Sequence, residues 1–187
     1  MESVPRRTVL RTALSLPLLG ALPLMAAETA PARRVASVPA DQDRFGQRRK
    51  VFGGLPIDVK VSARDSAGGL LIIEQIDDHK GGPPRHVHPE QDEWFHVIQG
   101  TYVLEVGEER FRLVDGDSVL APRGLPHVWA HAGEGTGRML IAFQPAGKMD
   151  AFFDAATRLQ GIPAGAELAQ LFREHGMEVL GPPLSLE

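Results

Sequence analysis

The sequence contains no cysteine among its 187 residues. Without cysteine no disulfide bond can form, and no thiolate can act as a nucleophile or bind a metal ion. Any metal ion must therefore be bound through nitrogen and oxygen atoms. The seven histidines are the first residues to consider as ligands.

The sequence also lacks an excess of positive charge. Its formal net charge is -4, whereas proteins that bind nucleic acids or anionic membranes generally present a basic surface. No helix-turn-helix pattern lies near the central region. The charge therefore argues against a nucleic-acid partner, and it does not indicate any particular substrate.

The composition is that of a globular protein that can bury a core, with 43% hydrophobic and 24% charged residues. Glycine (20) and proline (15) are abundant, which favours short strands joined by tight turns over a helical bundle. No internal repeat or low-complexity tract is present, so one barrel rather than two is expected.

Residues 1–32 are predicted to be an export signal that is removed. Arg6 and Arg7, followed by one free position, two apolar residues and a base, resemble a twin-arginine signal peptide. The uncharged run Thr12–Ala27 is shorter than the roughly 20 apolar residues of a membrane span. We expect a periplasmic or secreted protein with no stable membrane anchor after cleavage. An N-terminal anchor helix is the alternative interpretation.

The rest of the chain is predicted to contain a linker, an all-β domain and a helical extension. Residues 33–50 are polar and are predicted to be the linker. In residues 51–144 short apolar segments alternate with turn residues, as in a sandwich or barrel. The predicted strands are Ile57–Ser62, Gly69–Ile76, Arg85–His88, Trp94–Gln99, Thr101–Val106, Glu109–Val114, Ser118–Ala121, His127–His131 and Arg138–Gln144.

Residues 145–187 form the predicted helical extension. Met149–Leu159 has helical spacing, and Gly161-Ile162-Pro163 ends it. A second helix is predicted over Gly165–His175, with Gly176 as its stop. Apolar helical faces usually become buried, so both helices are expected to pack against the barrel and to supply core residues.

The chemistry-bearing residues are concentrated in one stretch and a later histidine. His86 and His88 are two residues apart, so on a strand both rings point to the same face. Pro89 breaks the strand, Glu93 follows, and His127 comes 34 residues after Glu93. Three imidazoles and one carboxylate suit one divalent transition metal, namely iron, manganese, nickel, cobalt or zinc.

These residues also resemble the two motifs of the cupin superfamily. The first motif is His-x-His, then Glu after four residues, then Gly after six more. This chain matches it with His86, His88, Glu93 and Gly100. The second motif is Gly, then Pro-x-Gly after five residues, then His after two more. This chain matches it with Gly116, Pro122, Gly124 and His127. The family often has Asn four residues after the last histidine, where this chain has His131.

The resemblance is to small single-domain cupins of the quercetin-dioxygenase-like type. It implies a double-stranded β-helix, which is a jelly-roll barrel, and the metal ligands His86, His88, Glu93 and His127. It also implies a metal-dependent dioxygenase acting on an enol or phenol. In that reaction Glu93 both binds the metal and accepts the substrate's hydroxyl proton.

Strand alternation adds a predicted substrate pocket. Phe95 and Val97 share the parity of Glu93, and Trp129 and His131 share that of His127, so all four are predicted pocket residues. His96 points outward by the same rule and is interpreted as a packing or interface residue.

Two other functions fit the same motifs. One is an isomerase, lyase or hydrolase that works without oxygen, and the other is a binding module in which the metal only orients a small molecule. The resemblance also suggests a homodimer, because sheet edges need cover.

Overall fold

The computed structural model describes residues 37–186, which lie within one compact unit, residues 33–187. The predicted export signal falls outside the described residues. Within residues 37–186 no helix is long and apolar enough to cross a membrane.

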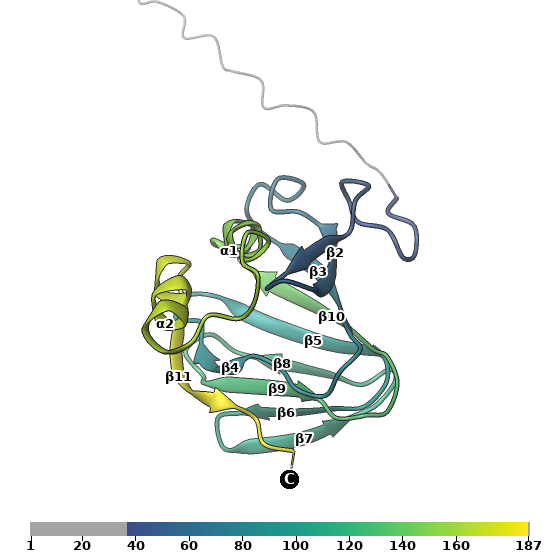
Figure 1. Ribbon diagram of the computed structural model, residues 1–187. Helices are drawn as coiled ribbons and strands as arrows, with labels where there is room; N and C mark the ends of the chain where they lie inside the picture. The colour runs from purple at the N-terminus through teal and green to yellow at the C-terminus, as the bar shows by residue number, and fades with distance from the viewer. Residues whose placement is uncertain (1–36, 187) are drawn as a thin grey trace, which may run out of the picture. The chain divides into compact units, whose positions relative to one another are not determined.

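The fold consists of two antiparallel sheets with a buried core between them (Figure 1). The six-stranded sheet has the order β1-β2-β3-β10-β5-β8, and the five-stranded sheet has the order β11-β4-β9-β6-β7. Consecutive strands often lie in different sheets, as in a jelly roll. The strands are β1 (Arg49–Val51), β2 (Leu55–Val61), β3 (Leu71–Asp77), β4 (Pro84–Val87), β5 (Asp92–Gln99), β6 (Tyr102–Val106), β7 (Glu109–Leu113), β8 (Ser118–Ala121), β9 (His127–His131), β10 (Gly137–Gln144) and β11 (Glu178–Pro183).

Period-two alternation explains the strands of the central region. Along β5 every second residue from Glu93 to Val97 is buried, and the residues between them are partly exposed. The hairpin of β6 and β7 turns at Gly107 and pairs Tyr102 with Leu113. All nine predicted strands are present, with ends that differ by at most two residues.

The predicted linker is more ordered than its composition indicates. Arg49–Val51 forms β1 and pairs with β2. Asp43 is buried, and its carboxylate accepts hydrogen bonds from the backbone N–H groups of Phe45 and Val59, each at 2.7 Å. Arg48 forms a bidentate ion pair with the buried Asp58. Residues 37–50 are thus attached along β2, because their charged side chains find partners there.

The C-terminal extension is not purely helical. The two predicted helices are present as α1 (Met149–Ala156) and α2 (Gly165–Glu174). The chain then returns as β11, which pairs with β4 and places Val179 opposite His86. This strand was not predicted from the sequence, because proline and glycine in Glu178–Pro183 weaken the strand pattern.

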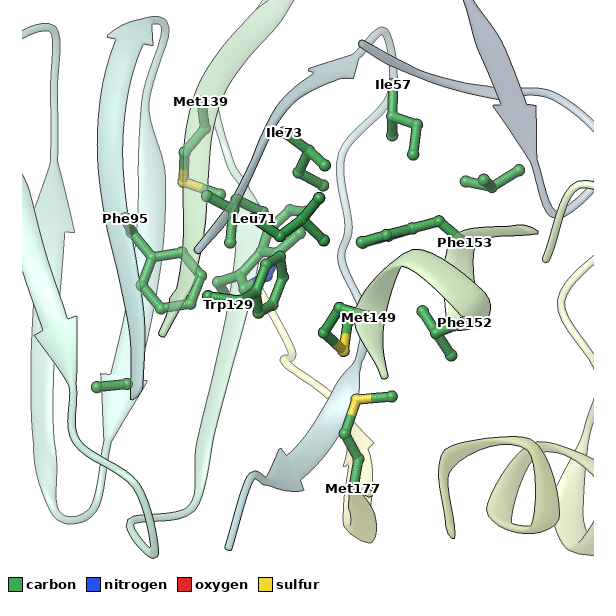
Figure 2. Close-up of a cluster of buried hydrophobic side chains, with 14 of the residues drawn as sticks. Ile57, Leu71, Ile73, Phe95, Trp129, Met139, Met149, Phe152, Phe153 and Met177 are labelled. Atoms are coloured by element: carbon green, nitrogen blue, oxygen red, sulfur yellow. The ribbon is translucent and has the colours of Figure 1, made fainter. Parts of the chain in front are cut away.

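Helix α1 closes one end of the core. Figure 2 shows Met149, Phe152 and Phe153 of α1 in the same buried cluster as Ile73 and other strand residues. The ring of Phe152 lies 5.4 Å from that of Phe172 on α2. Phe153 of α1 also contacts Phe143 on β10, and Phe172 of α2 contacts His86 on β4, so aromatic contacts hold both helices against the barrel.

Candidate metal centre

Two of the candidate ligands lie opposite each other on neighbouring strands of the five-stranded sheet. His86 on β4 pairs in register with His127 on β9, and their ring centroids are 4.6 Å apart. His88 follows immediately after β4. Its side chain has the parity of His86, so it joins the same buried face.

The fourth candidate comes from the opposite sheet. Glu93 lies near the start of β5, and its Oε2 atom is 2.8 Å from Nε2 of His127, 3.1 Å from Nε2 of His88 and 3.9 Å from Nε2 of His86. One ligand atom from each of the four residues lies within 4.8 Å of all the others. The structure thus brings together His86, His88, Glu93 and His127, and all four are buried.

The Nδ1 atoms of the three histidines face acceptor oxygens. Nδ1 of His86 is 2.8 Å from the carbonyl oxygen of Pro84, and Nδ1 of His127 is 3.1 Å from that of Leu125. Nδ1 of His88 is 2.6 Å from the carboxamide oxygen of Gln91. An acceptor at each Nδ1 favours the tautomer in which Nδ1 donates and the lone pair lies on Nε2, inside the cluster.

The residues fit a divalent metal ion. In that tautomer three Nε2 lone pairs and one carboxylate are four acceptors that face one another. Nε2 of His88 is buried without a hydrogen-bond partner, and such an orphaned atom is costly unless something binds it. Nitrogen and oxygen donors in this number suit zinc, iron, manganese, nickel or cobalt.

The pKa shifts of the four clustered residues also favour a bound positive charge. Burial, together with the nearby His127, lowers the pKa of His86 to about 3, so that ring is neutral. Burial alone would raise the pKa of Glu93, but its close contacts with Nε2 of His127 and of His88 outweigh the burial and hold this pKa below its usual range. Burial lowers the pKa of His127, and the bond and charge of Glu93 raise it to a greater extent. The cluster therefore stabilises a cation, whether a shared proton or a metal ion.

A cavity of about 500 Å³ opens beside this cluster, and His86, His88 and Glu93 form part of its wall. The remaining wall is mostly apolar and comes from both sheets and both helices. Aromatic side chains of the cavity wall lie beside the histidines. The ring of Phe172 packs edge-on 5.4 Å from His86, and that of Phe143 lies 5.9 Å from His88. Such a volume and lining are typical of a small-molecule site.

Only one of the four predicted pocket residues lines this cavity. Trp129 does so, whereas Phe95, Val97 and His131 are not among its described lining residues. Phe95 and Val97 do point inward as alternation predicted, but both are 0% exposed within the closed core. His131 is also buried, with its Nδ1 atom 3.2 Å from the carbonyl oxygen of His79. Parity predicts the face of the strand on which a side chain lies, but it does not predict how far along the barrel the cavity extends.

Several residues of the site were not predicted from the sequence. Phe172 and Met149 were expected only in the core, yet both line the cavity. Gln91 was not singled out, although it lies inside the first motif. Polar residues at inward positions of β3, Gln75 and Asp77, also line the cavity. The signal for these two was present, because Leu71, Ile73, Gln75 and Asp77 have the same parity.

His96 lies outside the cavity, as its parity predicted. Its ring stacks on Trp94 with centroids 5.5 Å apart, and its Nδ1 atom is 2.9 Å from the hydroxyl of Ser118 on β8. The residue thus packs on the outer face of the six-stranded sheet.

Comparison with known proteins agrees with this architecture. Residues 73–143 match the family model of the cupin domain. The fold is a cupin jelly roll. Over 85 residues the chain is 31% identical to quercetin 2,3-dioxygenase of Bacillus subtilis (strain 168), a stretch that covers 45% of this chain and 25% of that protein. The match therefore spans a quarter of the length of this relative.

Two solved structures were compared with this chain. KdgF from Halomonas sp. superposes with a TM-score of 0.51 at 21% identity, over 60% of this chain and 94% of that one. An RmlC-like cupin from Shewanella frigidimarina NCIMB 400 gives a TM-score of 0.47 at 19% identity, over 60% and 93% of the two chains. At 21% identity the likeness to KdgF establishes the fold alone.

Proposed function

We propose that this chain is a metal-dependent dioxygenase that acts on a small enol or phenol. The observation that carries the proposal is the position of the His86, His88, Glu93 and His127 cluster in the wall of an apolar cavity. The partial likeness to a quercetin 2,3-dioxygenase supports the same reaction class.

The four residues would hold the metal through three Nε2 atoms and the Glu93 carboxylate. When bound, such a metal supplies Lewis acidity toward an enol or phenol oxygen and, where it is redox-active, a route for electrons. A dioxygenase transfers both atoms of O2 to its substrate, so no external reductant is needed.

Glu93 has a second part in the proposal. Its contacts with the three histidines all involve Oε2. Oε1 makes none of these contacts, and we assign to it the hydroxyl proton of the substrate. Removal of that proton leaves an electron-rich enolate, which is the form that reacts with oxygen.

The walls of the cavity would orient a flat substrate and exclude water. Phe143, Phe172 and Trp129 present aromatic surface to the cavity, and aromatic walls favour flat organic ligands. Exclusion of water strengthens the electrostatic contacts at the cluster, because the local dielectric constant is low.

Oxygen consumption by the metal-loaded protein tests the proposal. With flavonols and related enols we expect uptake of one O2 per substrate consumed, and no uptake with the His86→Ala variant. Product formation that continues without oxygen would instead identify an isomerase, lyase or hydrolase. Saturable binding with no product would identify a binding module. Either result, or no uptake across the panel, contradicts the proposed reaction.

A further inference from the structure

A group of polar side chains lies in the cavity at some distance from the candidate metal centre. Gln75 and Asp77 occupy the last two inward positions of β3, and both are 4% exposed. Both line the same cavity as His86 and Glu93. Inward positions of a barrel strand are normally apolar, as Leu71 and Ile73 are, so two polar residues here need an explanation.

The register of the sheet shows how far this group lies from Glu93. Phe143 on β10 pairs with Glu93 on one side and with Leu71 on the other, so Leu71 is level with Glu93. Gln75 and Asp77 lie further along β3. At about 3.3 Å per residue they are roughly 13 and 20 Å beyond Leu71. The cavity thus has two polar regions with apolar walls between them.

The group is held in place by hydrogen bonds. The hydroxyl of Tyr102, a residue that is 0% exposed, donates to Oδ2 of Asp77 at 2.8 Å, and the amide of Gln75 donates to Oδ1 at 3.0 Å. Both donors are neutral. The carbonyl oxygen of Gln75 meets no donor within this group. A fixed pair of acceptor side chains at a cavity wall is suited to a ligand that carries a hydroxyl donor.

The electrostatics agree with a ligand role. Burial raises the pKa of Asp77, although the hydrogen bonds from Tyr102 and Gln75 act in the opposite direction. A carboxyl group that is disfavoured as a buried anion gains from any additional donor.

We propose that Gln75 and Asp77 form a second polar subsite, which binds a hydroxyl group on the end of the ligand remote from the metal centre. The ligand class is therefore an elongated, flat polyphenol with a metal-binding enol at one end and a hydroxyl group at the other. This subsite rests on the proposed function, because it requires an organic ligand at the metal centre.

Binding to the zinc-loaded protein tests the subsite apart from turnover, because zinc has no redox chemistry. The probes are quercetin, which has hydroxyl groups on its outer rings, and 3-hydroxyflavone, which keeps only the chelating group. We expect the wild type to bind quercetin about tenfold more tightly, as one buried hydrogen bond to a carboxyl group allows. Asp77→Asn should bring the two affinities close together.

Asp78→Asn is the matched control. It makes the same chemical change one residue along, at an exposed position where Asp78 accepts a hydrogen bond from the Thr136 hydroxyl. The control should keep the preference for quercetin. Zinc content and near-ultraviolet circular dichroism, measured for each variant, report whether the barrel and the metal centre are intact.

The outcomes separate the two proposals. Equal affinity of the wild type for both flavonols, or a preference that Asp77→Asn leaves unchanged, overturns the subsite and leaves the metal-dependent binding in place. Failure to bind either flavonol overturns the ligand class of the proposed function and the subsite with it.

Discussion

The carboxamide oxygen of Gln91 lies 2.6 Å from Nδ1 of His88. The amide nitrogen of the same side chain donates to the carbonyl oxygen of Pro145 at 2.6 Å. The bond to Pro145 fixes which end of the carboxamide faces the histidine. Gln91 therefore presents an acceptor, which favours the His88 tautomer with its proton on Nδ1 and its lone pair on Nε2.

Loss of this acceptor should weaken metal binding. For Gln91→Leu we expect the affinity for a divalent metal to fall about 10- to 100-fold, because His88 loses the bond that sets its tautomer and ring orientation. Gln91→Glu should recover much of the loss, since a carboxylate still accepts from Nδ1. Competition with a chromogenic chelator measures the affinity. Gln99→Leu, at an exposed position on β5, is the control, and equal losses in both Leu variants would contradict the positioning role.

Substitution of a ligand should remove the metal altogether. His86→Ala and His127→Ala take away Nε2 donors from the buried cluster, and we expect elemental analysis to show far less than one metal ion per chain. His96→Ala removes an imidazole from the outer face and should leave the metal content at the wild-type value. A His86→Ala variant that retains one tightly bound ion would show that the ion binds elsewhere.

Metal removal should also lower thermal stability. A ligand that binds only the folded state stabilises it, by about 4 kcal/mol when its free concentration is a thousand times Kd. A strong chelator should therefore lower the Tm of the wild type, and added metal should restore it. Calorimetry of His86→Ala provides the comparison, because its Tm should respond to neither treatment.

Much of the barrel and the whole metal cluster could be predicted from the sequence. Alternation along β5 and the turn at Gly107 are local signals, and the ligand spacing combines strand parity with two motifs. The motif glycines Gly100, Gly116 and Gly124 have φ values of 98, 91 and 79°. These angles lie in the left-handed region, where glycine is favoured, so the motif reflects backbone geometry as well as chemistry.

The remaining features depend on contacts between distant segments. The pairing of β11 with β4 joins residues that are more than 90 positions apart, and nothing in Glu178–Pro183 indicates a partner. The attachment of Asp43 to the backbone of Val59 is equally non-local. The cavity is lined by residues of both helices as well as both sheets, so strand parity alone does not predict that Phe95 and Val97 lie outside its lining.

One surface ion pair should give a stability difference that depends on pH. The hydrogen bonds and charge of Arg44, with a backbone bond from Ser62, lower the pKa of Asp65 to about 2. A folded-state pKa below the ordinary value of about 3.9 means that the stabilisation is complete above pH 4 and disappears as the pH falls toward 2. The Tm of Asp65→Asn should therefore be below that of the wild type at pH 6, and the gap should narrow at pH 3. Glu108→Gln, in an exposed turn, should show no comparable gap, and a constant gap for Asp65→Asn would contradict the linkage.

The loop before β4 lies so close to β9 that no side chain fits at Gly82. A Cβ atom added there would lie 1.9 Å from the carbonyl oxygen of Trp129, and both groups are backbone, so neither can turn away. We expect Gly82→Ala to lower the free energy of unfolding by about 3 kcal/mol, as overpacking in a tight interior does. Because Trp129 lines the cavity, its fluorescence should change as well. Urea unfolding measures the loss against Gly54→Ala, where an added Cβ atom meets nothing within 4 Å. Equal stability of these two variants would mean that β4 can move away from β9, and the facing pair His86 and His127 would then not be held rigidly.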